Sequence, residues 1–195
     1  MELLAVAALS YLIGSFSSAY IVGKLFMKID IRNHGSGNAG ATNAVRIMGK
    51  KLGVLTFLMD FAKGIVAVLL GSYLHASLGG YVSALFAVIG HNWPVFLSFK
   101  GGKGIATTIA VMAVLSFPTT LLSVAIGILT AFVTRYVSLG SVIFLSVLFI
   151  LTSLGIFVND QYLVALTLIL ALLGYYRHKE NIKRLLAGNE NKIGR

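Results

Sequence analysis

Long apolar runs separated by short polar segments dominate this chain. The runs cover roughly residues 3–23, 52–74, 81–99, 139–158 and 162–176. Their lengths are close to the roughly 20 residues with which a helix crosses the hydrocarbon core of a bilayer. The first run has no basic segment before it and no polar mature domain after it, so we expect a retained span and not a cleaved signal peptide. The pattern predicts an all-α integral membrane protein.

Residues 105–133 form a longer apolar stretch. The stretch is too long for one upright span of roughly 20 residues and short for two. Pro118 is the natural break, because proline interrupts a helix. Two short spans that meet at Pro118 return Arg135 to the side of Lys100 and Lys103, whereas one long span does not.

The distribution of positive charge favours two spans here. All of the 16 Lys and Arg residues except Lys63 then lie on one face, and the opposite loops carry none. Cytoplasmic loops of membrane proteins carry an excess of Lys and Arg. We therefore expect seven transmembrane helices, with the N-terminus outside and the C-terminus in the cytoplasm, in a single polytopic membrane domain that covers residues 1–195.

Composition narrows the class of protein further. Of the 195 residues, 57% are hydrophobic and 11% are charged, whereas a soluble domain carries roughly 25% charged residues. The absence of cysteine excludes a disulfide framework and a thiolate nucleophile. The four histidines lack metal-ligand spacing, so we expect no metal. The net charge of +10 is scattered between apolar runs, which argues against nucleic acid as a partner.

The segment Gly35–Asn43 is rich in glycine and small polar residues. Glycine allows positive φ angles and close backbone approach, and successive N–H groups in such a turn form an anion-binding concavity. Arg46 adds a fork suited to phosphate, and a helix that begins at Ala41 would add its N-terminal dipole. The segment matches neither a Walker A loop nor a Rossmann fingerprint. The alternative is a small-residue turn that only packs closely against neighbouring spans.

A second glycine segment, Lys100–Gly104, follows Gly90–Pro94. Pro94 should interrupt its helix, which is tolerated at membrane depth only against protein or a wet cavity. Lys103 lies between glycines as a mobile cation within a backbone nest. Alternatively, Lys100 and Lys103 only follow the positive-inside tendency, and His91 is an interior histidine with its bonds satisfied.

Two other groups of charged residues have functional and structural interpretations. Asp60 and Lys63 are three residues apart and share a helix face, and we slightly favour a mutual ion pair facing the bundle. The tail Arg177–Gly188 combines cations with an apolar stripe, which is typical of a short interfacial helix on anionic headgroups. A solvated basic tail is the alternative. His178 and Asn181 are also three apart and could face an active site together.

Carboxylates are scarce, and of the six acidic residues we expect Asp30 and Glu180 near the cytoplasmic loops. The sequence shows neither an acidic pair nor a Ser-His-Asp arrangement. An enzyme built this way needs a substrate that is already activated, such as an acyl phosphate, with catalysis by positioning and charge neutralisation. A phosphate or phosphate-ester transporter is the competing class, with a faint repeat between residues 37–42 and 102–107. A lipid-binding scaffold would not need two anion cradles.

Together these motifs identify a resemblance to a known family. The segments that carry it are, in chain order, Ser36–Asn43 with Arg46, Leu58–Gly64, Gly90–His91, Lys100–Gly104, Arg135–Ser138 and His178–Leu185. In order and spacing they resemble the bacterial acyl-phosphate:glycerol-3-phosphate acyltransferases, called PlsY, over the whole chain.

The resemblance implies a multi-pass enzyme of the bacterial plasma (inner) membrane with its active site on the cytoplasmic face. It would move a fatty acyl group from acyl phosphate to the 1-hydroxyl of sn-glycerol 3-phosphate, giving lysophosphatidic acid and phosphate in the first step of phospholipid synthesis. It implies no cofactor and no metal, and the enzyme that makes acyl phosphate is a candidate partner.

The resemblance also implies site residues. Those assigned to catalysis are Ser36, Arg46, Lys103, His178 and Asn181. Those assigned to binding acyl phosphate and glycerol 3-phosphate are Gly37, Asn38, Gly40, Thr42, Asn43, His91, Gly101, Gly102 and Ser141. We favour a substrate-assisted mechanism in which a phosphate oxygen helps to deprotonate the hydroxyl, with His178 as the one plausible conventional base.

Overall fold

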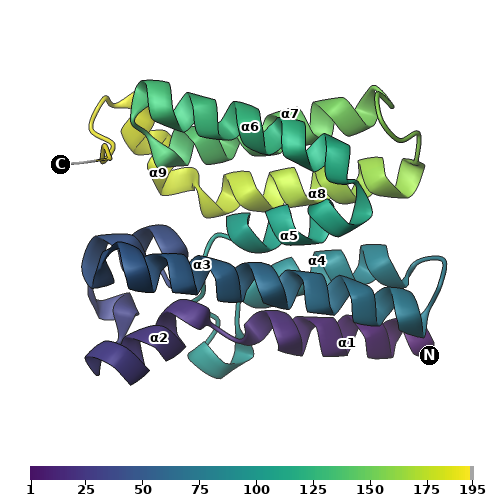
Figure 1. Ribbon diagram of the computed structural model, residues 1–195, viewed down its shortest axis with the longest axis horizontal. Coiled ribbons are helices and arrows are strands. Elements are labelled where there is room, and N and C mark those ends of the chain that lie inside the picture. Colours follow the sequence, from purple (N-terminus) through teal and green to yellow (C-terminus); the bar gives the residue numbers. More distant parts are fainter. Residues whose placement is uncertain (194–195) are drawn as a thin grey trace. The chain divides into compact units, whose positions relative to one another are not determined.

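The computed structural model describes residues 1–193, and within them every regular element is helical, which confirms the all-α class. Contacts divide the chain into two compact units (Figure 1). Unit 1 is Met1–Val114, and unit 2 runs from Leu115 to the C-terminus. The expectation of a single domain over residues 1–195 stays a prediction.

Unit 1 contains the helices α1 (Glu2–Ser15), α2 (Ser18–Met27), α3 (Ala41–Leu74), α4 (Gly79–Asn92) and α5 (Ile105–Leu115), with short 3₁₀ turns η1 (Ile31–Asn33) and η2 (Val95–Leu97). Helix α1 packs against α4, and α3 packs against both (Figure 1). A Cβ atom on Gly14 of α1 would collide with the backbone of Ala87 in α4. Glycine is therefore required here, because the two helices approach at backbone distance.

Unit 1 contains two helix breaks, of which only the first differs from the sequence expectation. The first apolar run is not one continuous helix, since α1 ends at Ser15 and α2 begins at Ser18. The freed carbonyl of Phe16 accepts a hydrogen bond of 2.6 Å from Lys63 Nζ, which satisfies a backbone group that lipid could not. Helix α3 is interrupted at Gly49, whose φ of +82° is not helical.

The expected third span is also shorter than predicted. Helix α4 ends at Asn92, well before residue 99, because Pro94 has no N–H to continue the helix. The break expected at Pro94 is thus confirmed. Residues Val95–Leu97 form the turn η2, and the chain then enters the second glycine segment.

Unit 2 contains α6 (Phe117–Thr134), α7 (Val137–Ser153), α8 (Gln161–Arg177) and α9 (Lys179–Leu186). The helical break expected near Pro118 is confirmed: α5 ends at Leu115, and Pro118 lies in the first turn of α6, where its missing N–H is harmless. Helix α7 packs against α6 and α8. The tail does form a short helix, α9. Helix α7, which contains most of the apolar run at residues 139–158, ends at Ser153 and not at residue 158.

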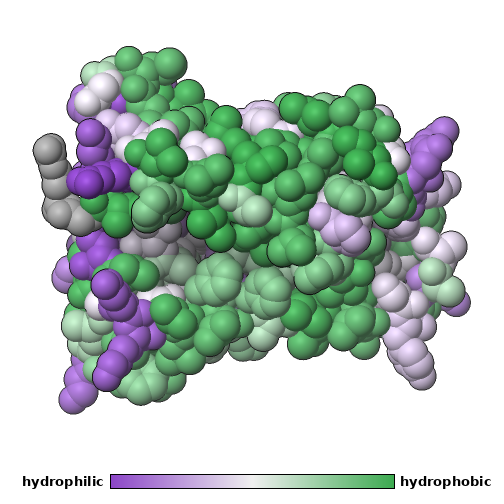
Figure 2. Space-filling model, turned by 45° about the horizontal axis from the view of Figure 1, so that its top comes forward, coloured by the Kyte–Doolittle hydropathy of each residue, from purple (hydrophilic) through white to green (hydrophobic). Residues whose placement is uncertain are grey.

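Large apolar side chains cover the outer sides of the helices, while hydrophilic ones gather near the helix ends (Figure 2). Phe132 is 81% exposed and Leu58 55% exposed, as expected of side chains that face lipid. Four helical segments are long and apolar enough to span a membrane, namely residues 2–27, 41–74, 79–97 and 117–134. Three shorter apolar helices, α5, α7 and α8, accompany them within the described chain.

Candidate functional site: two glycine segments and a C-terminal polar cluster

The first glycine segment is built around the buried side chain of Asn43. Its Oδ1 accepts a hydrogen bond from the Ser36 backbone N–H at 3.0 Å. Its Nδ2 donates to the carbonyl oxygens of His34 and Asn38, both at 3.0 Å, and approaches that of Ile31 at 3.3 Å. Asn43 therefore fixes the backbone of the loop, and its bonds point inward.

The loop leaves its other polar groups at the surface. Gly35 and Gly37 have φ angles of +61° and +69°, in the left-handed region that favours glycine. Ser36, Thr42 and Arg46 are exposed. Helix α3 does begin at Ala41, with Gly40 as its N-cap, so the dipole of its first turn adjoins this loop. The arrangement places the N-terminus of α3 and the exposed cation Arg46 beside the loop, and both suit an anion.

A hydrogen bond joins the segment before the first loop to the segment that leads into the second. Arg32 contacts Asp30 at 2.7 Å, and it donates a hydrogen bond of 3.0 Å to the carbonyl of Leu97. The hydrogen bonds from Arg32 hold the pKa of Asp30 below its ordinary value. The chain just before the first glycine segment is therefore bonded to the chain just before the second, and sequence reasoning did not anticipate this link.

The second glycine segment lies directly on the turn that follows α4. The Gly102 N–H donates to the His91 carbonyl at 3.1 Å. A Cβ on Gly101 would collide with that carbonyl, and a Cβ on Gly102 would collide with Nε2 of the His91 ring. Gly104 has a φ of +81°. Close packing, as well as conformation, thus requires these glycines, and Lys103 between them is partly buried.

Buried charges lie behind this segment. Lys63 Nζ is 2.8 Å from Asp60 Oδ1, and both side chains are nearly inaccessible. The mutual ion pair predicted from their spacing is confirmed. The sequence did not indicate that His91 joins it, with Nδ1 at 2.9 Å from Lys63 Nζ.

In unit 2, His178 and Asn181 are buried at the junction of α8 and α9. His178 Nδ1 lies 2.8 Å from the Gly174 carbonyl, which can only accept, so the proton is on Nδ1. A neutral His178 then presents Nε2 as an acceptor. Ser141, also in unit 2, donates to the Val137 carbonyl within its own helix.

Glu190 is a residue that sequence reasoning missed. Its carboxylate accepts hydrogen bonds from Asn181 Nδ2 at 2.7 Å, Arg184 Nε at 2.7 Å and Ser138 Oγ at 3.1 Å. Burial raises the pKa of Glu190, but these hydrogen bonds outweigh it and the net pKa is lowered. Its spacing of nine residues from Asn181 gave no helical signal, because the chain leaves α9 between them.

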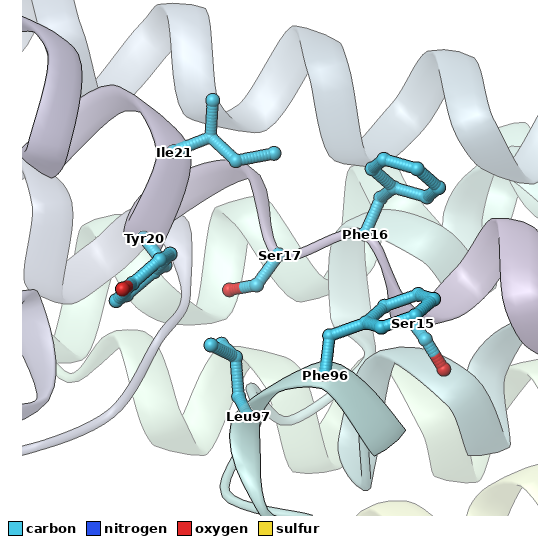
Figure 3. Close-up of a pocket in the computed structure, with 7 residues that line it drawn as sticks. All are labelled: Ser15, Phe16, Ser17, Tyr20, Ile21, Phe96 and Leu97. Atoms are coloured by element: carbon cyan, nitrogen blue, oxygen red, sulfur yellow. The ribbon is translucent and has the colours of Figure 1, made fainter.

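An apolar recess opens where α1 breaks from α2 (Figure 3). Its volume is about 290 Å³, and its lining residues are Ser15, Phe16, Ser17, Tyr20, Ile21, Phe96 and Leu97. The rings of Phe16 and Phe96 lie 5.8 Å apart. The recess could not be predicted from the sequence, because it depends on the helix break.

The structure thus brings Ser36, Arg46 and Lys103 into one unit, with their loops joined through Arg32. It places His178, Asn181 and Ser141 in the other unit.

Lipid-facing helices, a buried ion pair and polar loops at the helix ends define an integral membrane protein with loops suited to anions.

Comparison with known proteins identifies the family. The sequence profile of the family described as glycerol-3-phosphate acyltransferase matches residues 4–188. The chain is 49% identical to the glycerol-3-phosphate acyltransferase of Thermoanaerobacter pseudethanolicus over 188 residues, which cover 96% of this chain and 94% of that protein. It is 46% identical to the one of Halalkalibacterium halodurans, covering 95% and 93%.

Solved structures agree with this result. The crystal structure of PlsY (YgiH), an integral membrane glycerol 3-phosphate acyltransferase, in its glycerol 3-phosphate form superposes with a TM-score of 0.89 and 37% identity, covering 100% of this chain and 96% of that one. The lysophosphatidic acid form of that protein gives a TM-score of 0.87. The chain therefore belongs to the PlsY family of glycerol-3-phosphate acyltransferases, which confirms the resemblance and disfavours the transporter.

Proposed function

We propose that this acyltransferase uses acyl phosphate as its donor and the 1-hydroxyl of sn-glycerol 3-phosphate as its acceptor. A new ester C–O bond forms as the C–O bond to the phosphate breaks. The hydroxyl proton leaves with the phosphate, so the products are lysophosphatidic acid and inorganic phosphate. No redox partner or cofactor enters this balance.

The observation that carries the proposal is the pair of glycine segments joined through Arg32 and Leu97. Both substrates of the proposed reaction contain a phosphate, and each glycine segment has a cation in or beside it, Arg46 for the first and Lys103 for the second. The relative crystallised with glycerol 3-phosphate and with lysophosphatidic acid supports the same acceptor and product.

We assign catalysis to Ser36, Arg46 and Lys103 in unit 1 and to His178 and Asn181 in unit 2. The residues assigned to substrate binding remain Gly37, Asn38, Gly40, Thr42, Asn43, His91, Gly101, Gly102 and Ser141. The exposure of Ser36 and Arg46 supports direct contact with a phosphate. The inward bonds of Asn43 favour a contribution through loop geometry.

The proton acceptor has two candidates. A phosphate oxygen of the substrate can take the hydroxyl proton itself, since acyl phosphate needs little help from a side-chain base. The Nδ1 bond of His178 to Gly174 leaves Nε2 as the acceptor in the neutral ring, which suits a general base. We favour substrate assistance and expect His178→Asn to lose only a modest factor in kcat, whereas complete loss with normal folding would favour His178 as base.

We further propose seven spans, an external N-terminus, and a cytoplasmic C-terminus and active site in the bacterial plasma membrane. The chain has no cysteine, so single-cysteine variants report accessibility without background. We expect Asn33→Cys in intact cells to resist an impermeant thiol reagent and Ser77→Cys, between α3 and α4, to react. The reverse pattern would overturn the orientation.

The decisive assay is phosphate release by the purified protein supplied with palmitoyl phosphate. We expect release to depend on glycerol 3-phosphate and to match the lysophosphatidic acid formed. Release without glycerol 3-phosphate would indicate a phosphatase. If the folded protein releases no phosphate from palmitoyl phosphate but is active with another acyl donor, the family assignment stands and the proposed donor is wrong.

A further inference from the structure

The buried cation Lys63 uses all of its hydrogen-bonding capacity within unit 1. Its ammonium group has three protons and no acceptor. The three acceptors around Nζ are the Phe16 carbonyl at 2.6 Å, Asp60 Oδ1 at 2.8 Å and His91 Nδ1 at 2.9 Å. Asp60 Oδ1 also accepts a hydrogen bond from Ser18 Oγ at 2.7 Å. Charge and hydrogen bonds therefore lock this cluster in one arrangement.

The cluster determines which nitrogen of His91 carries the proton. His91 Nδ1 lies 2.9 Å from Lys63 Nζ and 3.4 Å from Asp60 Oδ1. The shorter contact is with Lys63, which can only donate, so we infer a lone pair on Nδ1. The imidazole proton is then on Nε2, at the opposite edge of the ring. That edge lies against Gly102, where a Cβ would collide with Nε2.

His91 consequently holds the second glycine segment in two ways. Its carbonyl accepts the Gly102 N–H at 3.1 Å, and its ring packs against the Gly102 backbone. Lys103 follows directly in the chain, and a shift of the ring would move the backbone that carries it. The ring is only 4% exposed, so it contributes from behind the loop.

We propose that Asp60, Lys63 and His91 are positioning residues that hold the Gly101–Lys103 backbone in its phosphate-binding conformation. The proposal rests on the proposed function, since it assumes that this segment binds a substrate phosphate. It assigns the buried ion pair a role in catalysis beyond stabilising the bundle. It also revises the assignment of His91 to substrate binding, since His91 then acts through Gly102 and not by contact with substrate.

The test separates positioning from simple ion pairing. Replacing both charges in Asp60→Asn/Lys63→Met leaves no uncompensated buried charge, so such a pair often remains folded. If the pair only stabilises the bundle, this double variant should keep the wild-type kcat/KM for glycerol 3-phosphate. We expect kcat/KM to fall at least about tenfold while the protein stays folded, because misplacement by about 1 Å can cost about 100-fold.

A matched control removes a different buried polar pair from the same unit. Ser10 Oγ donates to Ser83 Oγ at 2.9 Å, and both residues are buried. Ser83→Ala should lower the thermal stability without changing kcat/KM. A double variant that is folded and has wild-type kcat/KM would overturn the proposal.

A measurement on the unmodified protein decides the geometry even if the double variant does not fold. In ¹⁵N-histidine-labelled protein we expect the His91 ring to carry its proton on Nε2 and the His178 ring on Nδ1. His34 is exposed and His75 is half-buried. Their signals are identified because each disappears in the corresponding variant, His34→Gln or His75→Gln. Two buried rings that are both protonated on Nδ1 would refute the role of Lys63. An inactive wild-type protein with the expected tautomers would refute the proposed function and not the cluster geometry.

Discussion

Replacing Asn43 by aspartate tests how the first glycine segment is held, because the two side chains have nearly the same shape. Asn43 Nδ2 lies 3.0 Å from the carbonyl oxygens of His34 and Asn38. In Asn43→Asp an acceptor oxygen would face these acceptors instead of a donor. The bond from the Ser36 N–H to Oδ1 could remain.

The expected loss of stability in Asn43→Asp follows from the hydrogen bonds that Nδ2 can no longer donate. The amide nitrogen has two protons, and each neutral hydrogen bond contributes about 1 kcal/mol net, with a further penalty of about 1–3 kcal/mol for a buried group left unsatisfied. Asn43 is only 2% exposed, so water cannot replace the lost donors. We expect the free energy of unfolding to fall by about 3 kcal/mol, and kcat/KM to fall more than about tenfold as Ser36 loses its position.

Asn33→Asp provides the control, since it places the same new charge in an exposed position of the same loop. Thermal unfolding in detergent micelles and release of phosphate from palmitoyl phosphate would be measured for both variants. Equal melting temperatures and equal kcat/KM values for the two variants would refute the scaffold role of Asn43.

Three further predictions concern the other polar contacts. Glu190→Gln removes the charge that binds Arg184, so we expect about 2 kcal/mol less stability in thermal unfolding, whereas the exposed Glu180→Gln should change it by under about 0.5 kcal/mol. The folded-state pKa values of Glu190 and Asp30 are lowered, so their stabilisation is complete above the ordinary values and is lost as pH falls through the lowered ones. Melting temperatures should therefore drop below about pH 4, and less steeply in Glu190→Gln. Gly102→Ala should collide with His91 and lower kcat/KM. Gly49→Ala meets nothing within 4 Å, but its φ of +82° and ψ of +171° are essentially restricted to glycine, so it should cost about 1–3 kcal/mol of stability in a melting experiment.

The sequence predicted the helices better than their interruptions. Apolar runs located the long helices, and Pro94 and Pro118 marked two breaks because proline acts locally on the backbone. The break at Phe16 and Ser17 has no proline or glycine to announce it. It is compensated by Lys63, which lies 47 residues further along the chain, and local patterns carry no information about such tertiary partners.

The candidate site, like the fold, was predicted from the sequence only in part. Glycine-rich composition and nearby cations indicated both loops, and the helix start at Ala41 and the pair of Asp60 with Lys63 were correct. The inward bonds of Asn43, the link from Arg32 to Leu97 and the contacts of Glu190 were not foreseen. Each joins residues whose spacing does not match a helix turn, so only the folded chain brings them together.

One physical principle connects these unforeseen contacts. A glycine-rich loop has few side chains with which to hold its own shape, so another group must hold it. Asn43 accepts a hydrogen bond from the Ser36 backbone, and the His91 carbonyl accepts one from the Gly102 backbone. Glu190 accepts one from the Asn181 side chain. In each case a buried polar group makes the hydrogen bond, and such bonds gain strength away from water. Losing one of them should therefore lower stability and catalysis together, whereas losing an exposed donor such as Arg46 should lower catalysis and leave the melting temperature nearly unchanged.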